Sequence, residues 1–400
     1  MITNNGMLTI TGGGNILGGN NSTGAGGIIN NGTLTLLDGN IVSNKGLEGG
    51  AVVNSKNATF TLSGGGLYIN ASTKYGGGAV INHGTMVMTS GGISSNTAAM
   101  NGGGIWTDGT LHISDGVIEG NTAATNGGGI CFFAGTLAVS GSPVILGNNS
   151  DTDNLYINTG AVVTCAGPLE ELAQIHMTHA EAPTVEEPRL LMTGVTGETW
   201  GLAEDDPDQL VKVDDAGNAK LYLVARVNYD FNTGGMYSDR DRVPLGTSYT
   251  LRGRPGYIPE HMVFMGWRMG EDGEHLLQPG DQVTLTGDTD FTAVWISERA
   301  LFQRQIDEAE DGATLMLEGD LIAIAGDSEL TLPRDKTITI DLNGHTIDRG
   351  LGDTSVSRND GQAFYVLISN LILKTAPSPA AMATMAAPHS SITVPWSWRT

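Results

Sequence analysis

The stretch Ile118–Ile130, "IEGNTAATNGGGI", contains four glycines, two asparagines and almost no side chain that could build a core. A glycine-rich run can bind phosphate, but the Walker type needs Lys and then Ser or Thr directly after its last glycine. Here Gly129 is followed by Ile130 and Cys131. A dinucleotide fingerprint should occur once, between a strand and a helix. This stretch recurs along the chain, which indicates a structural repeat.

The first 150 residues repeat at intervals of 25 or 26, and three sequence features share this period. The first is a small residue that opens segments such as "GTLTLLDG", at Gly6, Gly32, Ala58, Gly84, Gly109 and Gly135. The second is a hydrophobic-x-x-Asn pattern that ends at Asn44, Asn70, Asn96, Asn121 and Asn148. The third is a Gly-Gly step before a small or aliphatic residue, at Ile28, Ala51, Ala79, Ile105 and Ile130. Three features with one period indicate a solenoid of similar turns.

Each repeat contains three short strand-like segments with Gly or Asn between them. In "GTLHISDG", Leu111 and Ile113 alternate with His112 and Ser114, which is typical of a strand with one buried face. Such segments predict a parallel β-helix, whose coils hydrogen-bond to one another about 4.8 Å apart. Equivalent positions then stack, and we expect an inner column of Leu34, Phe60, Met86, Leu111 and Leu137. Asparagines can satisfy backbone groups at the corners, where glycines allow positive φ.

Charge is distributed unevenly along the 400 residues, which carry a net charge of -23 and only 16% charged residues. Residues 1–150 hold three lysines and five acidic residues, a net charge of -2, so the remainder carries about -21. This balance argues against nucleic acid and anionic membrane surfaces as partners, because both require clustered Lys and Arg. No signal peptide or run of 18 apolar residues is found, so we expect no membrane insertion.

The two cysteines, Cys131 and Cys165, have no metal-ligand spacing. A disulfide between them is one interpretation, and we favour two buried free thiols.

The alternating "GGA(I/V/L)" and "FxxN" motifs resemble the repeats of chlamydial polymorphic outer-membrane proteins and related bacterial adhesins. In this chain Ile or Leu replaces the Phe, and Gly often replaces the Ala, as in "NGGGIW". The likeness covers residues 1 to about 150. It implies a right-handed β-helix displayed at a cell surface with a role in adhesion, and it transfers no catalytic residue.

The period loosens after Asp151, and we expect irregular terminal coils up to residue 224. Residues 225–296 resemble a Listeria–Bacteroides repeat, a small β-grasp-like module of bacterial surface proteins. The matching residues are Phe231, Gly234 and Gly235, then Pro255-Gly256-Tyr257, Phe264 with Gly266-Trp267, and Ala293-Val294-Trp295. The tryptophans and Phe264 can be core anchors or an exposed sugar platform, and we favour the core.

Residues 297–374 begin with a short amphipathic helix that has Leu301, Phe302, Ile306 and Ala309 on one face. The alternation in "ELTLPRDKTITIDLNGHTIDRG" then predicts strands, so this segment is expected to be the capped start of a second β-helix. "DLNGHTID" is interpreted as a turn between strands.

Residues 375–400 match nothing upstream in composition. Read one base back, Met382–Thr400 can become "NGNNGGATFINNGTMVMED", which resembles "GGGAVINHGTMVMTS" at Gly76–Ser90. We therefore expect an out-of-frame or disordered tail. Because Met1 falls in mid-repeat, we also expect the chain to be a fragment of a longer protein.

Catalytic chemistry on a β-helix needs convergent acids or bound calcium with a basic residue. The regular coils offer Asp38, Asp108, Asp115 and Glu119, and no Arg precedes Arg189. We interpret Asp38 and Asp115 as turn residues.

Three further features have chemical interpretations that we weigh against structural ones. His176 and His179 have a spacing that could ligate a metal but lack a third ligand, and the stretches "NNSDTDN" and "AEDDPDQ" can bind calcium loosely or be solvated turns. Trp106 follows "GGGI" where other coils have Val52, Val80 and Cys131, so we favour a core position over an outward ring that stacks on a sugar.

Together these features predict an all-β chain and no catalytic, cofactor-binding or metal-ligating residue, with loosely bound calcium as the one cofactor considered. We expect a cell-surface or extracellular structural and adhesive protein, not an enzyme. It would be a repeat stalk that presents binding surfaces to host or matrix glycans or proteins. The alternative is a carbohydrate-active enzyme, a polysaccharide lyase or hydrolase with its acids in the coils after Asp151.

Overall fold

The computed structural model describes residues 1–150, 154–235, 238–270, 275–349, 363–366, 369–375 and 392–393. The chain forms two compact units. The first comprises Met1–Ala225, Arg242–Thr247 and Leu285–Gly287; the second comprises Arg226–Asp241, Ser248–Thr284 and the described residues from Asp288 on.

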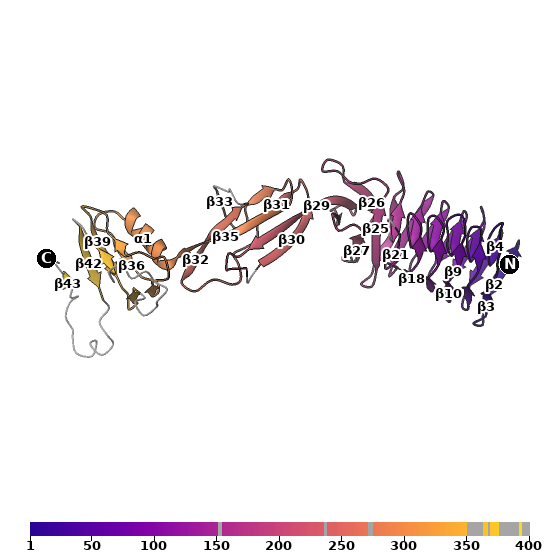
Figure 1. The fold of residues 1–400 in the computed structure, drawn as a ribbon, viewed down its shortest axis with the longest axis horizontal. Coiled ribbons are helices and arrows are strands. Elements are labelled where there is room, and N and C mark those ends of the chain that lie inside the picture. The colour runs from indigo at the N-terminus through magenta and orange to yellow at the C-terminus, as the bar shows by residue number, and fades with distance from the viewer. Residues whose placement is uncertain are drawn as a thin grey trace. The chain divides into compact units, whose positions relative to one another are not determined.

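The first unit is a solenoid whose coils contribute one strand to each of three parallel ladders, visible as stacked arrows from β2 to β26 in Figure 1. The first ladder contains β1 (Ile2–Asn4), β4 (Ile28–Asn30), β8 (Val52–Asn54), β12 (Val80–Asn82), β16 (Ile105–Thr107), β20 (Ile130–Phe132) and β23 (Leu155–Ile157). The second contains β2 (Met7–Ile10), β5 (Thr33–Leu36), β9 (Thr59–Leu62), β13 (Thr85–Met88), β17 (Thr110–Ile113), β21 (Thr136–Gly141), β24 (Val163–Leu169) and β26 (Arg189–Thr193). The third contains β3 (Asn15–Leu17), β6 (Asn40–Val42), β10 (Gly66–Tyr68), β14 (Gly92–Ser94), β18 (Val117–Glu119) and β22 (Val144–Ile145).

A fourth, shorter ladder closes four of the coils. It contains β7 (Lys45–Gly46), β11 (Ala71–Ser72), β15 (Thr97–Ala98) and β19 (Thr122–Ala123). The predicted parallel β-helix with coils of about 26 residues is therefore confirmed.

The inner column predicted from the sequence is present along the second ladder. Leu34 pairs with Phe60, Phe60 with Met86, Met86 with Leu111, and Leu111 with Leu137. All five side chains are fully buried. A register slip of one residue would place the neighbouring threonines inside instead, so burial of one face fixes the register of these strands.

Two ladders of buried asparagines run along the solenoid. In the predicted one, Asn70 donates its backbone N–H and its Nδ2 to Asn96 Oδ1 at 2.9 and 3.0 Å, and Asn96 donates in the same way to Asn121 Oδ1 at 3.0 and 2.8 Å. The second ladder was not predicted: its members are Asn4, Asn30, Asn54, Asn82 and Thr107, joined at 2.7–3.0 Å. Most of its members stand two residues before the small residue that opens the next segment, and this spacing was the signal available in the sequence.

The glycines of the opening stretch have different roles. Gly127 has φ of 64°, which favours glycine. Gly128 is needed for close approach, because a Cβ there would lie 2.6 Å from the backbone N of Asn149. The same is true of Gly129, whose Cβ would lie 2.8 Å from Asn148 Nδ2. Gly120 likewise has a positive φ, of 61°. Two of the four glycines therefore make room for the next coil.

The last coils of the first unit are irregular, as expected. The long strand β25 (Gln174–His179) pairs with β22 through its first half and with β23 through its second, so it joins two ladders that are separate in earlier coils. β27 (Leu202–Glu204) pairs with β25. Beyond it the pairing turns antiparallel: β29 (Ala219–Asp230) pairs with β26 and β28 (Gln209–Val213).

The second unit begins with a mixed sheet around an aromatic core. The end of β29 pairs in parallel with β35 (Thr289–Ser297), and β35 pairs antiparallel with β32 (Met262–Met269), next to β33 (Leu276–Leu277). β30 (Ser238–Pro244) pairs with β29, and β31 (Ser248–Thr250) with β34 (Gln282–Thr284). Trp267 is 1% exposed and packs edge-on against Tyr229 and Phe264. The preference for a core role is therefore confirmed for Trp267.

The predicted helix is α1 (Glu298–Glu308), which begins where the Ser297 side chain accepts from the N–H of Ala300. Phe302 and Ile306 on its inner face pack against a core that includes Ile338 and Ile340. Short strands then pair in parallel: β36 (Thr314–Met316), β39 (Thr337–Asp341) and β42 (Asn370–Lys374); β37 (Leu321–Ile322) and β40 (Ile347–Asp348); and β38 (Leu330–Thr331) and β41 (Phe364–Tyr365). A helix-capped start of stacked coils is thus present (Figure 1).

The predicted tail, residues 375–400, lies outside the described residues except for residue 375 and β43 (Ile392–Thr393), which pairs with β42.

Candidate functional site

Trp106 lies on the outside of the solenoid, so the expectation of an inner core position was wrong. It is the middle residue of β16, between the inward Ile105 and Thr107, and it pairs with Ile81 and Cys131 on the neighbouring coils. The sequence comparison placed Trp106 level with Val80, whereas the strand pairing places it level with Ile81, one residue further along. The difference arises because Ala79 stands at the position that Gly104 has in the next coil. A shift of one residue in a strand moves a side chain to the opposite face.

The Trp106 ring forms part of an aromatic cluster that crosses three coils. It stacks on Phe133 with ring centroids 5.5 Å apart and planes inclined by 28°, and its edge meets His83 at 5.5 Å. Its inner side packs against a small group that includes Val53 and Ile81, beneath the glycine-rich loops. The ring is therefore held in place while it remains partly exposed.

Polar groups flank this cluster. His83 Nδ1 lies 2.8 Å from Asp108 Oδ1, and both side chains are more than a third exposed. Phe133 is 48% exposed. An accessible aromatic face beside a hydrogen-bonding pair can stack on the apolar face of a ligand and bind its polar rim. We call His83, Trp106, Asp108 and Phe133 the aromatic corner.

The other acids of the regular coils do not join Asp108. Asp38 Oδ1 accepts from the N–H of Gly13 at 2.8 Å, and Asp115 Oδ1 accepts from the N–H of Gly116 at 2.7 Å. Both are turn residues, as interpreted from the sequence. Glu119 ends β18 in the third ladder, whereas Asp108 follows β16 in the first.

Acidic side chains of the stretch "AEDDPDQ" form hydrogen bonds and an ion pair within the last coils. Glu204 pairs with Arg242 at 2.9 Å and accepts from the N–H of Val211 at 3.1 Å. Asp206 accepts from the N–H of Asp208 at 2.9 Å. In the other stretch, "NNSDTDN", Asp151 and Asp153 fall outside the described residues.

Asp205 terminates the predicted asparagine ladder, a role that sequence reasoning missed. After Asn148 the ladder continues to Asn154, whose backbone N–H donates to Asp205 Oδ2 at 3.1 Å and whose Nδ2 donates to Oδ1 at 2.6 Å. Thr178 Oγ1 also donates to Oδ2, at 3.0 Å. Every rung donates two hydrogen bonds to the next, so the last rung needs an acceptor-only group, and a carboxylate is one.

The two histidines whose spacing could ligate a metal, His176 and His179, have different partners. His176 Nδ1 lies 3.9 Å from Asp205 Oδ1, and His179 Nδ1 accepts from the N–H of Glu181 at 3.0 Å. Within the described part of the chain, no group of three or more His, Cys, Asp or Glu side chains gathers in a way that could hold a metal ion.

Both cysteines are buried and free, as favoured from the sequence. Burial raises the pKa of the Cys131 thiol to about 12. Since the thiolate is the reactive form, Cys131 is not a nucleophile near neutral pH.

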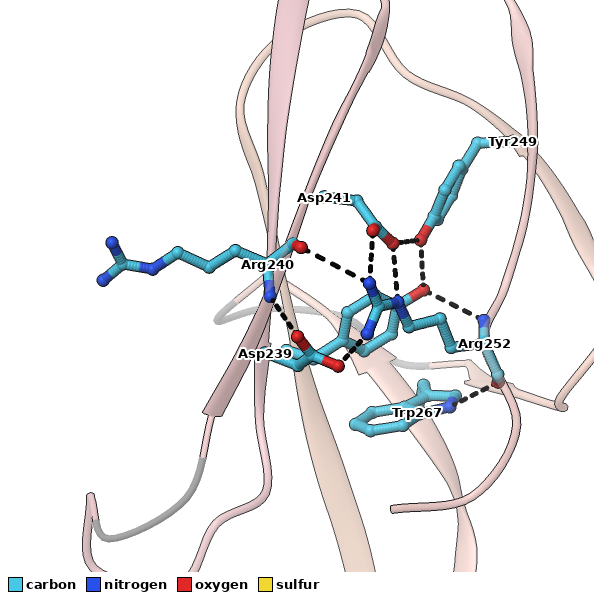
Figure 2. A network of polar contacts seen from close by, with 7 residues as sticks. Asp239, Arg240, Asp241, Tyr249, Arg252 and Trp267 are labelled. Carbon is cyan, nitrogen blue, oxygen red and sulfur yellow. Dashed lines mark hydrogen bonds and ion pairs between the residues drawn. The ribbon is translucent and has the colours of Figure 1, made fainter. Parts of the chain in front are cut away.

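The second unit contains a polar network around Arg252, shown in Figure 2. Arg252 pairs with Asp239 and Asp241, and Tyr249 donates to Asp241 as well. The backbone N–H of Arg252 donates to the Tyr229 hydroxyl, which in turn donates to the Tyr249 hydroxyl at 3.0 Å. Burial, then the hydrogen bond to Asp241, raises the pKa of Tyr249, which therefore stays protonated as a donor.

This network is connected to the aromatic core of the second unit. The Arg252 carbonyl accepts from Trp267 Nε1 at 3.2 Å, so the ion pairs and the aromatic core support each other (Figure 2).

"DLNGHTID" forms the turn predicted for it. Asp341 Oδ1 accepts from the N–H of Asn343 at 3.0 Å, and Asn343 and Gly344 have positive φ between β39 and β40.

Trp295 Nε1 donates to the carbonyl of Phe231 at 2.7 Å, which ties the second tryptophan to the module.

Among the described residues, no helix is long and apolar enough to cross a membrane. Comparisons with protein-family models, with curated proteins and with solved structures find no match to this chain.

Proposed function

We propose that this chain is a structural and adhesive protein of the cell surface, a repeat stalk that presents binding surfaces to host or matrix glycans or proteins. The solenoid is consistent with a stalk, because each coil pairs with its neighbours and the length grows one coil at a time. The module at residues 225–296 follows this solenoid along the sequence and precedes the coils of the second unit.

The observation that carries the adhesive part is the aromatic corner. Trp106, Phe133, His83 and Asp108 come from three successive coils and lie together at the surface. A contiguous exposed aromatic patch, unlike a single exposed residue, supports a binding role. Aromatic residues with a polar rim are enriched at binding surfaces.

The test is retention of the full chain on immobilised polysaccharides and matrix proteins. We expect Trp106→Ala and Phe133→Ala to reduce retention about tenfold, in line with the loss of one buried aromatic anchor. Trp200→Ala is the matched control, because Trp200 is 58% exposed and lies in another part of the solenoid. Equal retention of all three variants would contradict the proposal. Release of reducing ends or unsaturated products in the same assay would favour the carbohydrate-active enzyme instead.

A further inference from the structure

A shallow cavity of about 290 Å³ lies on the outer face of the third ladder, away from the residues of the aromatic corner. It is lined by Gly65, Tyr68, Gly91, Gly92, Ser94, Val117 and Glu119. These residues belong to the strands β10, β14 and β18 and to the turns that precede the first two.

The cavity lies beside two successive rungs that lack a side chain. Gly66 pairs with Gly92, while the rungs on either side carry Asn40 and Val117. Neither Gly66 nor Gly92 has a positive φ, so the backbone does not require glycine at these positions.

Tyr68 is the one aromatic residue that lines this cavity. A Cβ on Gly66 would lie 2.1 Å from Tyr68 Cζ, and one on Gly92 would lie 3.0 Å from the Tyr68 hydroxyl. The ring therefore occupies the space of the missing side chain and lies across the strand backbone, as aromatic residues do when they cover strand glycines. One face is packed, and the side chain remains partly exposed.

Two polar side chains follow the ring in register. Tyr68 pairs with Ser94, and Ser94 pairs with Glu119, so a hydroxyl and a carboxylate stand one and two rungs away, at about 4.8 Å per rung. Glu119 carries the one charge among the lining residues, and no Lys or Arg lines the cavity.

We infer that this cavity binds a pyranose ring of a neutral polysaccharide. This inference rests on the proposed adhesive function and names the ligand class. The apolar C–H face of the sugar stacks on Tyr68, and its hydroxyl groups donate to Glu119 and exchange hydrogen bonds with Ser94. The single negative charge disfavours uronic or sulfated polymers, because a like charge repels an anionic ligand. The volume suits one or two sugar rings, since pockets for larger ligands start at about 300 Å³.

The experiment measures binding of the full chain to neutral hexasaccharides (cellohexaose, xylohexaose, mannohexaose and laminarihexaose) by isothermal titration calorimetry. We expect at least one to bind. Tyr68→Ala should weaken binding about tenfold and Tyr68→Phe should retain it, because the stacking ring is lost in the first variant and kept in the second. Tyr75→Ala is the matched control: Tyr75 is 40% exposed in the same coil and does not line the cavity.

Gly66→Ala tests the geometry without removing the ring. The new Cβ would displace Tyr68 from the strand, so we expect a loss of binding similar to that of Tyr68→Ala with an unchanged thermal unfolding temperature. Oligogalacturonate and a glucosamine hexamer serve as acidic and cationic probes. Preferential binding of either probe would overturn the neutral-sugar assignment.

The outcomes separate this inference from the proposed function. If the hexasaccharides bind and only Trp106→Ala or Phe133→Ala weakens them, the adhesive proposal stands and the Tyr68 site is refuted. If no hexasaccharide binds, the sugar assignment is refuted, and retention on matrix proteins decides the adhesive proposal independently.

Discussion

Replacement of Asn96 by alanine is the sharpest test of what holds the solenoid together. Asn96 Oδ1 accepts from the backbone N–H and Nδ2 of Asn70, and its Nδ2 donates to the carbonyl of Leu67 at 2.9 Å and to Asn121 Oδ1 at 2.8 Å. The residue is fully buried, so no water replaces these partners. Asn96→Ala leaves the buried Asn70 N–H without its acceptor. A buried polar group left unpaired costs about 1–3 kcal/mol, so we expect ~1–3 kcal/mol of lost stability.

Asn31→Ala is the matched control. Asn31 is exposed, and although its Nδ2 donates to Asn5 Oδ1 at 2.9 Å, water can take over that bond. We expect it to change the free energy of unfolding by about 0.5 kcal/mol or less.

The assay is urea unfolding followed by circular dichroism, together with hydrogen exchange of the peptides around β10, β14 and β18. Asn96→Ala should lower the unfolding midpoint and speed exchange in these coils first, since the broken bonds lie there. If Asn96→Ala costs no more than Asn31→Ala, the ladder contributes nothing specific and our argument fails.

Three further predictions follow from single groups. Burial raises the pKa of Cys131 from 9.0 to about 12, so the unfolded chain loses this proton first as pH rises. The contribution of Cys131 to stability is therefore complete below pH 9 and lost between about pH 9 and 12; Cys131→Ala should flatten the pH dependence of the unfolding midpoint in that range. Asp205→Asn keeps one acceptor oxygen for Asn154 and should cost less than Asp205→Ala in thermal unfolding; equal costs would exclude the cap role. Arg252→Ala leaves Asp241 without its cation and should destabilise the second unit by about 1–3 kcal/mol, measured by exchange in β29 and β32, with the first unit unchanged.

The period, the strands and the inner column were predictable from the sequence, because each depends on spacing within one coil. Once successive coils repeat, stacking in register gives equivalent residues equivalent environments, so "GTLHISDG" was enough to place Leu111 in the core. The helix at Glu298–Glu308 was predictable for a similar reason, since its apolar face follows from the spacing of residues that are close in sequence.

Features that join distant parts of the chain, or that depend on one residue of register, required the tertiary structure. Asp205 accepts a hydrogen bond from Asn154, which is 51 residues earlier in the sequence. The coils there no longer repeat regularly, so no sequence pattern predicts this contact. Trp106 faces outward because it is the middle residue of β16, where it pairs with Ile81, and only strand pairing shows that Val80 is not its equivalent. Tyr68 lies over Gly66 because the glycine leaves room for it, and a ring's position depends on the space that the folded backbone leaves. Repetition determined the scaffold, whereas the surfaces where binding is proposed arise where the repetition is broken and packing decides the outcome.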